Sequence, residues 1–145
     1  MFNLGNARTP EQLEKMKKLT EKGACVFCKE CLEEYHDHPI EEYGKFWIIT
    51  KNDYPYANTK THYLLIHREH ITHIKELSDE AKVEYFNFTE KIAKLHNSPG
   101  ASVTMRFGDD RFTGASIAHL HAHVICGYEK TSESKPITTV VAWSE

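Results

Sequence analysis

Three histidines alternate with small or aliphatic residues in the run His119-Leu120-His121-Ala122-His123. This period-two pattern is typical of a half-buried β-strand, in which successive side chains point to opposite faces. We therefore expect the three imidazoles on one face and the apolar residues between them on the other. At about 3.3 Å per residue the outer rings stand roughly 13 Å apart, so all three do not easily bind one metal ion. A row of imidazoles instead offers a nucleophile, a proton donor and a metal ligand or phosphate contact.

The alternative interpretation of this run is a polar strand face with solvated histidines. Strict alternation inside the chain is an unusual composition, which favours the functional interpretation. A short segment, Gly114-Ala115-Ser116, precedes the histidines. Its backbone N–H groups are candidate donors to charge that develops in a reaction, although Gly and Ser are also common in turns for conformational reasons.

Cysteines form a second group of candidate ligands, Cys25-x-x-Cys28-x-x-Cys31. No signal-peptide pattern precedes them, so we expect a cytoplasmic protein in which such clustering indicates metal binding or redox chemistry. The first two cysteines have the spacing of a two-thiolate zinc half-site. A local site that adds Cys31 and either His36 or His38 is one way to complete it. Free buried cysteines are the alternative without a metal.

The composition sets limits on the class of protein. The chain has 145 residues, of which 40% are hydrophobic and 27% charged, which predicts one ordinary globular domain. A net charge of −3 argues against general binding to a nucleic acid polymer. No stretch approaches the roughly 20 apolar residues of a membrane span, so no membrane partner is expected.

The elements that must position the histidines are strands and helices in alternation. An N-terminal helix is expected to begin at the Thr9-Pro10 cap and to end at Gly23. A second helix begins at Ser78 and presents a core-facing stripe at helical spacing, made of Ala81, Tyr85, Phe88, Ile92 and Leu95. Besides the histidine strand, strands are predicted over 46–49, 63–66, 102–107 and 137–143. Residues 25–45 are expected to form a turn and an acidic segment.

The order strand, strand, helix, strand, strand indicates an α+β fold, an antiparallel sheet packed with a long helix. The run from Gly114 to Val124, Gly-x-Ser-x-x-His-x-His-x-His and an apolar residue, resembles the signature of the histidine triad (HIT) nucleotide hydrolases and transferases. Residues 61–71 resemble the family's Thr-His-aromatic-Leu-Val-Ile-Pro-Lys-x-His-Ile segment, with His67 in place of Pro. The resemblance covers roughly residues 24–128 and agrees with the α+β fold.

The domain organisation follows from the extent of this resemblance. We expect a HIT-like domain over residues 24–145, preceded by a helical extension over residues 1–23 that packs against it or contributes to a dimer. The resemblance also implies a homodimer.

The resemblance assigns catalytic roles residue by residue. His121 is the family's central histidine, which attacks the α-phosphorus of a nucleotide and forms a nucleotidyl-histidine. A neutral imidazole is a competent nucleophile near pH 7, and the covalent intermediate divides the displacement into two steps. His123 corresponds to the histidine that contacts the phosphate oxygens, Ser116 to the serine near the scissile phosphate, and His62 to a histidine that supports the active site.

The resemblance also implies a structural zinc ion. Some HIT proteins carry Cys-x-Phe-Cys near their start, which matches Cys25-Val26-Phe27-Cys28, and complete the site with two histidines. Here these correspond to His70 and His119, so the predicted ligands are Cys25, Cys28, His70 and His119. Catalysis itself is expected to need no metal.

Nucleotide contacts are predicted around the same strands. Asn52 occupies the position of a polar residue on the ribose, and either Trp47 or the Tyr54-Pro55-Tyr56 cluster is placed to flank a base. Arg106 stands where many members have the Asn of Asn-x-Gly, and a guanidinium there can bind a polyphosphate tail bidentately. Backbone N–H groups near Gly114 complete the predicted contacts.

These observations predict a cytoplasmic nucleotide hydrolase or nucleotidyl transferase. Its substrate is expected to be a nucleoside phosphate derivative, either a dinucleoside polyphosphate or a nucleotide conjugate. One alternative is a metal-dependent enzyme that uses His121 and His123 as a ligand pair with a third ligand elsewhere. Another is a non-catalytic nucleotide-binding module, which would bind without forming a covalent intermediate.

Overall fold

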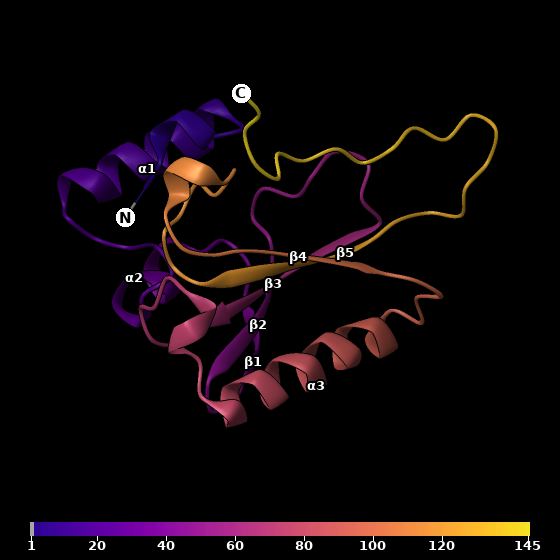
Figure 1. Ribbon diagram of the computed structural model, residues 1–145, viewed down its shortest axis with the longest axis horizontal. Coiled ribbons are helices and arrows are strands. Elements are labelled where there is room, and N and C mark those ends of the chain that lie inside the picture. Colours follow the sequence, from indigo (N-terminus) through magenta and orange to yellow (C-terminus); the bar gives the residue numbers. More distant parts are fainter. Residues whose placement is uncertain (1) are drawn as a thin grey trace.

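The computed structural model describes residues 2–145 and centres on a five-stranded antiparallel sheet (Figure 1). Its strands are β1 (Ile40–Tyr43), β2 (Trp47–Lys51), β3 (Thr61–His67), β4 (Ser102–Arg106) and β5 (His121–Cys126). They lie in the order β1-β2-β3-β5-β4, so the strand that carries the histidines is next to the edge strand β4.

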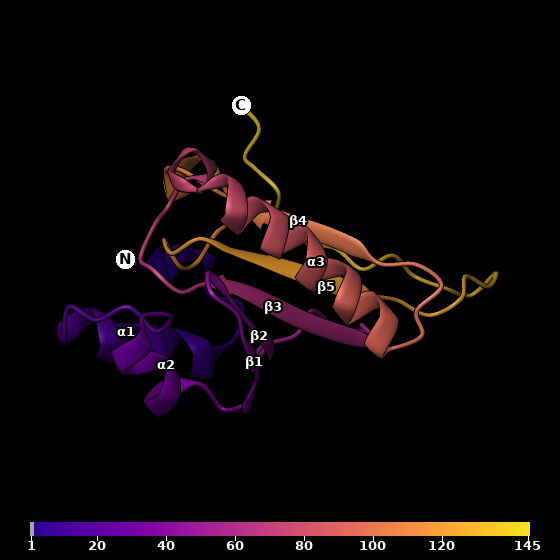
Figure 2. The same ribbon diagram turned by 90° about the horizontal axis from the view of Figure 1, so that it is seen from below.

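Helices cover both faces of the sheet. The α-helices are α1 (Pro10–Glu21), α2 (Lys29–Tyr35) and α3 (Asp79–Leu95), and short 3-10 helices span Leu4–Asn6, Ile74–Glu76 and Asp110–Phe112. Figure 2 shows α3 along one face, with α1 and α2 on the opposite side. The predicted α+β fold, an antiparallel sheet packed with a long helix and preceded by an N-terminal helix, is confirmed.

The α3 face holds the larger core. Its buried residues come from α3 and from alternate positions of three strand segments: Trp47, Ile49, Tyr63, Leu65, Phe88, Ile92, Leu120, Ala122 and Val124. The helix begins as predicted, because the Ser78 side chain accepts a hydrogen bond from the Ala81 N–H. The predicted stripe is wrong at Leu95, which is 59% exposed because the last turn of α3 carries it beyond this core.

The opposite face holds a second core, to which the N-terminal helix belongs. It consists of Leu19, Val26, Phe27, Leu32, Ile48, Leu64 and Ile66. The helix has the predicted ends: Thr9 accepts a hydrogen bond from the Gln12 N–H, Pro10 is its first residue, and Gly23 follows it with a φ of +64°. Since Leu19 is 1% exposed and packs with residues of the sheet, residues 10–21 share a core with it.

Two expectations about local structure are wrong in whole or in part. The predicted turn forms at residues 25–28, but the acidic segment after it contains α2 and β1, which were not predicted. The strand predicted over 137–143 does not form, and the segment makes only an isolated bridge, between Thr113 and Ala142. The β-branched residues of this segment favour an extended backbone, but a strand also needs a neighbouring strand to pair with. Residues 138–140 and 143 instead line a cavity. No helix within residues 2–145 is long and apolar enough to cross a membrane.

Candidate active site and metal centre

Register places the histidines of β5 on the face opposite α3. His121 lies directly across from Arg106 of β4 and Ile66 of β3, and His123 lies across from Leu64. Leu120 and Ala122, which alternate with the three histidines, are buried in the α3 core, as the alternation predicts. His121 and His123 are themselves only 6% and 7% exposed, with their ring centroids 5.1 Å apart.

The hydrogen bond of His121 determines which of its nitrogens is free. Its Nδ1 lies 2.6 Å from the His119 carbonyl oxygen, which can only accept a hydrogen bond, so Nδ1 carries the proton. The Nε2 lone pair of the neutral ring is therefore available. Burial, reinforced by the positive charges of Arg106 and Arg8, lowers the pKa of His121 to about 4. At neutral pH this ring is uncharged, and its Nε2 lone pair is not protonated.

A second chain of contacts determines the protonation of His123. The Tyr56 backbone N–H donates to His62 Nδ1 at 3.0 Å, so neutral His62 carries its proton on Nε2. This Nε2 lies 2.8 Å from His123 Nδ1 and donates to it. The remaining nitrogen of His123, Nε2, then carries a proton of its own. Burial lowers the pKa of His62 to about 4 and that of His123 well below its usual value, which keeps both rings neutral.

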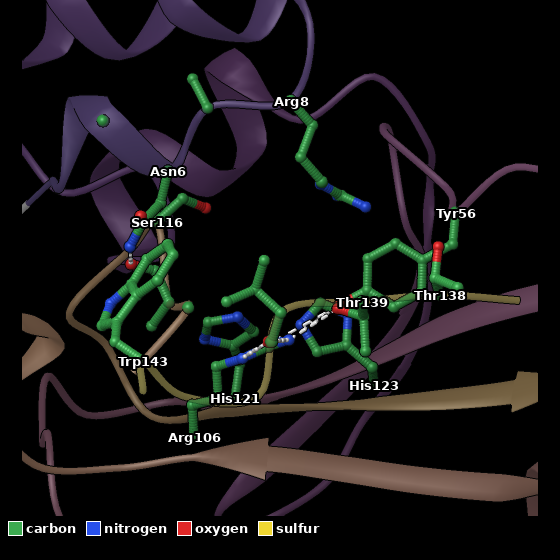
Figure 3. A pocket seen from close by; sticks show the side chains of 15 residues that line it. Asn6, Arg8, Tyr56, Arg106, Ser116, His121, His123, Thr138, Thr139 and Trp143 are labelled. Carbon is green, nitrogen blue, oxygen red and sulfur yellow. Dashed lines mark hydrogen bonds between the residues drawn. The ribbon is translucent and has the colours of Figure 1, made fainter. Parts of the chain in front are cut away.

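A cavity of about 440 Å³ opens over these rings (Figure 3). Its walls come from segments far apart in the sequence: residues 5–8, Tyr56, Arg106, the loop 114–116 and the C-terminal residues 138–140 and 143. Figure 3 shows the two histidines together, with Arg8 above Tyr56 and Trp143 opposite. Such a cavity can hold a small anionic ligand against the imidazoles.

Tyr56 connects the charged groups of this cavity. Its ring stacks on His123 with centroids 5.5 Å apart and planes 23° from parallel. The Arg8 guanidinium carbon lies 4.4 Å from the centroid of the same ring, within cation–π distance. Both terminal nitrogens of Arg106 lie 3.4 Å from the tyrosine hydroxyl, to which they donate. The side chain therefore positions two cations beside the histidines.

The loop before the histidines is held closely on both sides. A Cβ on Gly114 would lie 2.6 Å from the Val140 carbonyl oxygen, so only glycine permits this approach of the C-terminal segment. From the other side, Asn6 donates to the Ala115 carbonyl oxygen at 2.7 Å. Ser116 lines the cavity and its carbonyl accepts a backbone hydrogen bond from Asn3. Three parts of the chain thus hold the backbone of the loop that carries Ser116.

The predicted metal ligands lie together in a separate cluster. One donor atom each from Cys25, Cys28, His70 and His119 falls within 4.8 Å of all the others. Cys25 Sγ lies 3.4 Å from His119 Nδ1, and Cys28 Sγ lies 3.3 Å from His70 Nδ1. A tetrahedral zinc ion with bonds of about 2.3 Å to sulfur and 2.05 Å to nitrogen needs such atoms about 3.6 Å apart. The residues therefore fit a four-coordinate metal ion.

The protonation of the cluster also suits a metal. His119 Nε2 donates to the His67 carbonyl oxygen at 2.6 Å, which leaves the Nδ1 lone pair facing the thiols. Burial lowers the pKa of His119 to about 3, so the ring stays neutral. Burial and the neighbouring Cys25 raise the pKa of Cys28 to about 12. A cation between the four groups would supply the charge that allows both thiols to ionise.

Two sequence-based expectations do not fit these positions. Trp47 cannot flank a base in the cavity: it is 0% exposed in the α3 core, where its ring nitrogen donates to the Ala81 carbonyl oxygen. A continuous apolar run does not show which residues face which side, and this prediction is wrong. His36 and His38 do not join Cys31, because one ring nitrogen of each contacts the Asp53 carboxylate, at 3.1 and 3.0 Å.

Asn52 lies at the edge of the site rather than on the wall of the large cavity. It is 7% exposed, its side-chain nitrogen is 3.1 Å from His62 Nε2, and its oxygen accepts the Tyr54 N–H at 3.0 Å. It also lines a narrow extension of about 50 Å³ beneath α1, which His121 and His123 share. The residue is thus close to the histidines with its oxygen occupied, whereas its amide nitrogen cannot donate to His62 Nε2, because that nitrogen carries the proton.

Several residues of the cavity had no signal in the sequence. Asn6 and Arg8 precede the first helix without a motif, and Thr139 and Trp143 lie in a segment that reads as an ordinary strand. Their approach to the histidines depends on contacts between residues 33 to 109 positions apart. The polar Asn-x-Arg before a helix cap is the only trace that the sequence offers.

Comparisons with known proteins agree with this fold. The sequence profile described as HIT domain matches residues 55–130, more than half of the chain, and the chain belongs to the HIT family. That match includes the histidine row and the segment that resembles the family, as the sequence predicts. A search of curated protein sequences finds no significant match.

Solved structures show the same architecture. A HIT family hydrolase from Clostridium thermocellum is 24% identical, with a TM-score of 0.59, over 79% of this chain and 96% of that chain. A HIT family hydrolase from Legionella pneumophila is 22% identical, with a TM-score of 0.58, over 75% of this chain and 97% of that chain. A zinc-bound histidine triad family protein from Mycobacterium smegmatis is 18% identical, with a TM-score of 0.57, over 77% and 81%. At these identities the likeness concerns the fold.

Proposed function

We propose that this protein is a hydrolase or nucleotidyl transferase that acts at the α-phosphorus of a nucleoside phosphate derivative. The observation that carries the proposal is the free Nε2 of His121, which faces a cavity flanked by two guanidinium groups. The family includes proteins titled hydrolases, and a histidine triad protein from Sulfolobus tokodaii is titled nucleotide-binding. Both titles agree with a reaction at a nucleotide.

In the first step, His121 Nε2 forms a bond to the α-phosphorus while the bond from phosphorus to the leaving group breaks. The leaving group departs with the electron pair of that bond. The ring becomes a positively charged nucleotidyl-imidazole, and the His119 carbonyl on Nδ1–H stabilises that charge. The His123 Nε2–H and the Ser116 hydroxyl would donate to the phosphoryl oxygens, where negative charge increases.

In the second step, water or another acceptor attacks the phosphorus of the intermediate. The P–N bond breaks and its electron pair returns to His121 Nε2, which restores the neutral ring. The proton of the attacking water leaves with the product phosphate or passes to solvent. His62 would hold His123 in the donor tautomer through both steps, as its 2.8 Å contact suggests.

The remaining predicted contacts have distinct proposed roles. Arg106 lies directly across from His121 and would bind phosphate oxygens beyond the scissile bond. Backbone N–H groups near Gly114 would add donors on the other side. Asn52 would contact the ribose from the extension beneath α1.

We further propose that Cys25, Cys28, His70 and His119 hold a structural zinc ion. The donor spacing supports it, and the protein from Mycobacterium smegmatis is titled zinc-bound. When bound, zinc would tie the turn before α2 to the start of β5 and add to the folding free energy. Thiolate ligands favour a reducing compartment, which agrees with a cytoplasmic location. The alternative use of His121 and His123 as metal ligands is disfavoured, since no group of three metal-type donors among residues 2–145 includes either.

The test is a search for the covalent intermediate. The protein is incubated with a panel of nucleoside polyphosphates and nucleotide conjugates, quenched, and examined by mass spectrometry for a nucleotidyl group on His121. An adduct on that peptide, together with its loss in His121→Ala, supports the proposal. Turnover with an unimpaired His121→Ala variant contradicts it, and saturable binding without adduct or turnover identifies a binding module instead.

A further inference from the structure

We propose that Arg8, from the segment before α1, is a substrate-binding residue that acts with Arg106 to select nucleotides whose leaving group itself carries phosphate. This inference rests on the proposed function and narrows its substrate class. It assigns to the N-terminal extension a part in recognition, in addition to its part in packing.

The first observation that supports the inference is the position of Arg8. The residue lines the same cavity as His121 and His123, and Figure 3 shows its guanidinium directed over Tyr56 toward the histidines. One terminal nitrogen donates to the Tyr54 carbonyl oxygen at 2.6 Å, and one face rests on the Tyr56 ring. A guanidinium carries five N–H donors, so further donors remain for a ligand.

The segment that carries Arg8 is fixed to the site rather than attached only by the helix. Phe2 forms a bridge with Ile117, and the Asn3 N–H donates to the Ser116 carbonyl oxygen at 3.0 Å. Asn6 bonds to the same loop, and the Thr9 cap begins α1 directly after Arg8. The backbone on both sides of Arg8 is thus held, which lowers the entropic cost of binding through its side chain.

The two guanidinium groups bond to neutral acceptors. Arg8 donates to a backbone carbonyl, and Arg106 donates to the Val140 carbonyl, the Thr139 hydroxyl at 2.7 Å and the Tyr56 hydroxyl. Tyr56 lies between them, with Arg8 on its ring and Arg106 at its hydroxyl. Two positive charges therefore face one cavity. An anionic ligand between them would relieve their mutual repulsion.

A single phosphoryl group does not need both cations. In the proposed reaction the scissile phosphate already receives donors from His123 and Ser116. When the leaving group is itself a phosphate, the breaking P–O bond transfers its electron pair to a bridging oxygen on that phosphate. Arg8 and Arg106 would stabilise this charge and the charge of further phosphates, as bidentate guanidinium groups do. A neutral leaving group would gain none of this.

The experiment compares two substrates that share the same nucleotidyl group. Dinucleoside tetraphosphate has a polyphosphate leaving group, and the matching nucleoside 5′-phosphoramidate has a neutral amine; adenosine and guanosine forms of both are used. For each variant the kcat/KM with the tetraphosphate is divided by the kcat/KM with the phosphoramidate. We expect Arg8→Gln to lower this ratio by about 10- to 100-fold, the range of charge-assisted hydrogen bonds, and Arg8→Lys to lower it less. The control Arg111→Gln changes an exposed arginine that pairs with Asp109, and its ratio should equal that of the natural protein.

The outcomes separate the two proposals. If the natural protein uses both substrates and Arg8→Gln leaves the ratio unchanged, or lowers both efficiencies equally, the present inference is overturned and the proposed function stands. Use of the phosphoramidate but not the tetraphosphate overturns it as well. If neither substrate is used and His121 carries no adduct, the proposed function fails. A thermal melt of Arg8→Gln identifies any loss of fold, in which case Arg8→Lys decides.

Discussion

His119 and His121 are two residues apart, yet their rings present opposite nitrogens to different surroundings. His119 donates from Nε2 to the His67 carbonyl and turns Nδ1 toward two thiols. His121 donates from Nδ1 to the His119 carbonyl and turns Nε2 toward the open cavity. The residue types are identical, and both rings are kept neutral by burial. What differs is the backbone oxygen that each ring meets, and this oxygen decides which nitrogen is free.

The alternation of histidines therefore determines only that their rings lie on the same face of the strand. The chemistry available to each ring follows from the carbonyl that orients it. If the assignment is right, substitutions of His121 should lower turnover without changing metal content. Substitutions in the cluster around His119 should lower metal content directly and affect turnover only as a consequence. Substitutions and pH titrations can test this separation, beginning with the largest effect.

The strongest test removes the proposed nucleophile. His121→Ala is expected to lower kcat by at least about 10³-fold, because no other group forms the covalent intermediate. Metal content by elemental analysis and the melting temperature should stay close to those of the natural protein. Substantial remaining turnover, or loss of the metal, would mean that the two sites are not separate.

The second test removes a ligand from the cluster. His70→Ala is expected to lower bound zinc and to destabilise the protein by about 3 kcal/mol, or roughly 10 °C in melting temperature. His70 contacts Cys28 but does not line the cavity, so its loss should act through the metal. Cys31→Ser is the control and should retain the metal. Retention of zinc by His70→Ala instead indicates a local site that uses Cys31.

The third test concerns the residue that orients His123. His62→Phe preserves an aromatic ring but removes the 2.8 Å hydrogen bond to His123 Nδ1. We expect kcat to fall by about 10- to 100-fold, the range for loss of a residue that orients another through a hydrogen bond, with little change in metal content. An unchanged kcat would show that His123 needs no partner to hold its tautomer.

The last test concerns the dependence of stability on pH. Since the pKa of His62 and of His121 is lowered to about 4 in the folded protein, the unfolded chain binds more protons between pH 6.5 and 4. These two rings should therefore leave the free energy of unfolding unchanged above pH 6.5 and lower it below that pH, by up to about 1.4 kcal/mol per pH unit for each ring. Denaturant titrations at several pH values measure this. His62→Phe should show a shallower fall, and an equal slope would mean that protonation of His62 does not contribute to it.

The sequence was informative where a local rule decides the outcome. Period-two alternation correctly separated Leu120 and Ala122 from the histidines, and the Thr9 cap and Gly23 correctly bounded the first helix. The Cys-x-x-Cys half-site needed the family resemblance to find its distant histidines, because 42 residues separate Cys28 from His70.

The sequence was uninformative where distant packing decides. An apolar run over residues 46–49 predicts a buried strand but cannot say that Trp47 faces α3 rather than the cavity. Residues 137–143 have strand-like composition, yet a strand forms only where a neighbour offers its free edge. The contacts of Arg8 depend on how the first residues lie on the loop 114–116, which no local pattern encodes.

Both ends of the chain lie beside the cavity, as residues 5–8 on one side and residues 138–140 and 143 on the other. None of these residues belongs to the central sheet. Substitutions in the two segments can therefore alter which ligands the cavity admits, while the strand that carries the histidines stays intact.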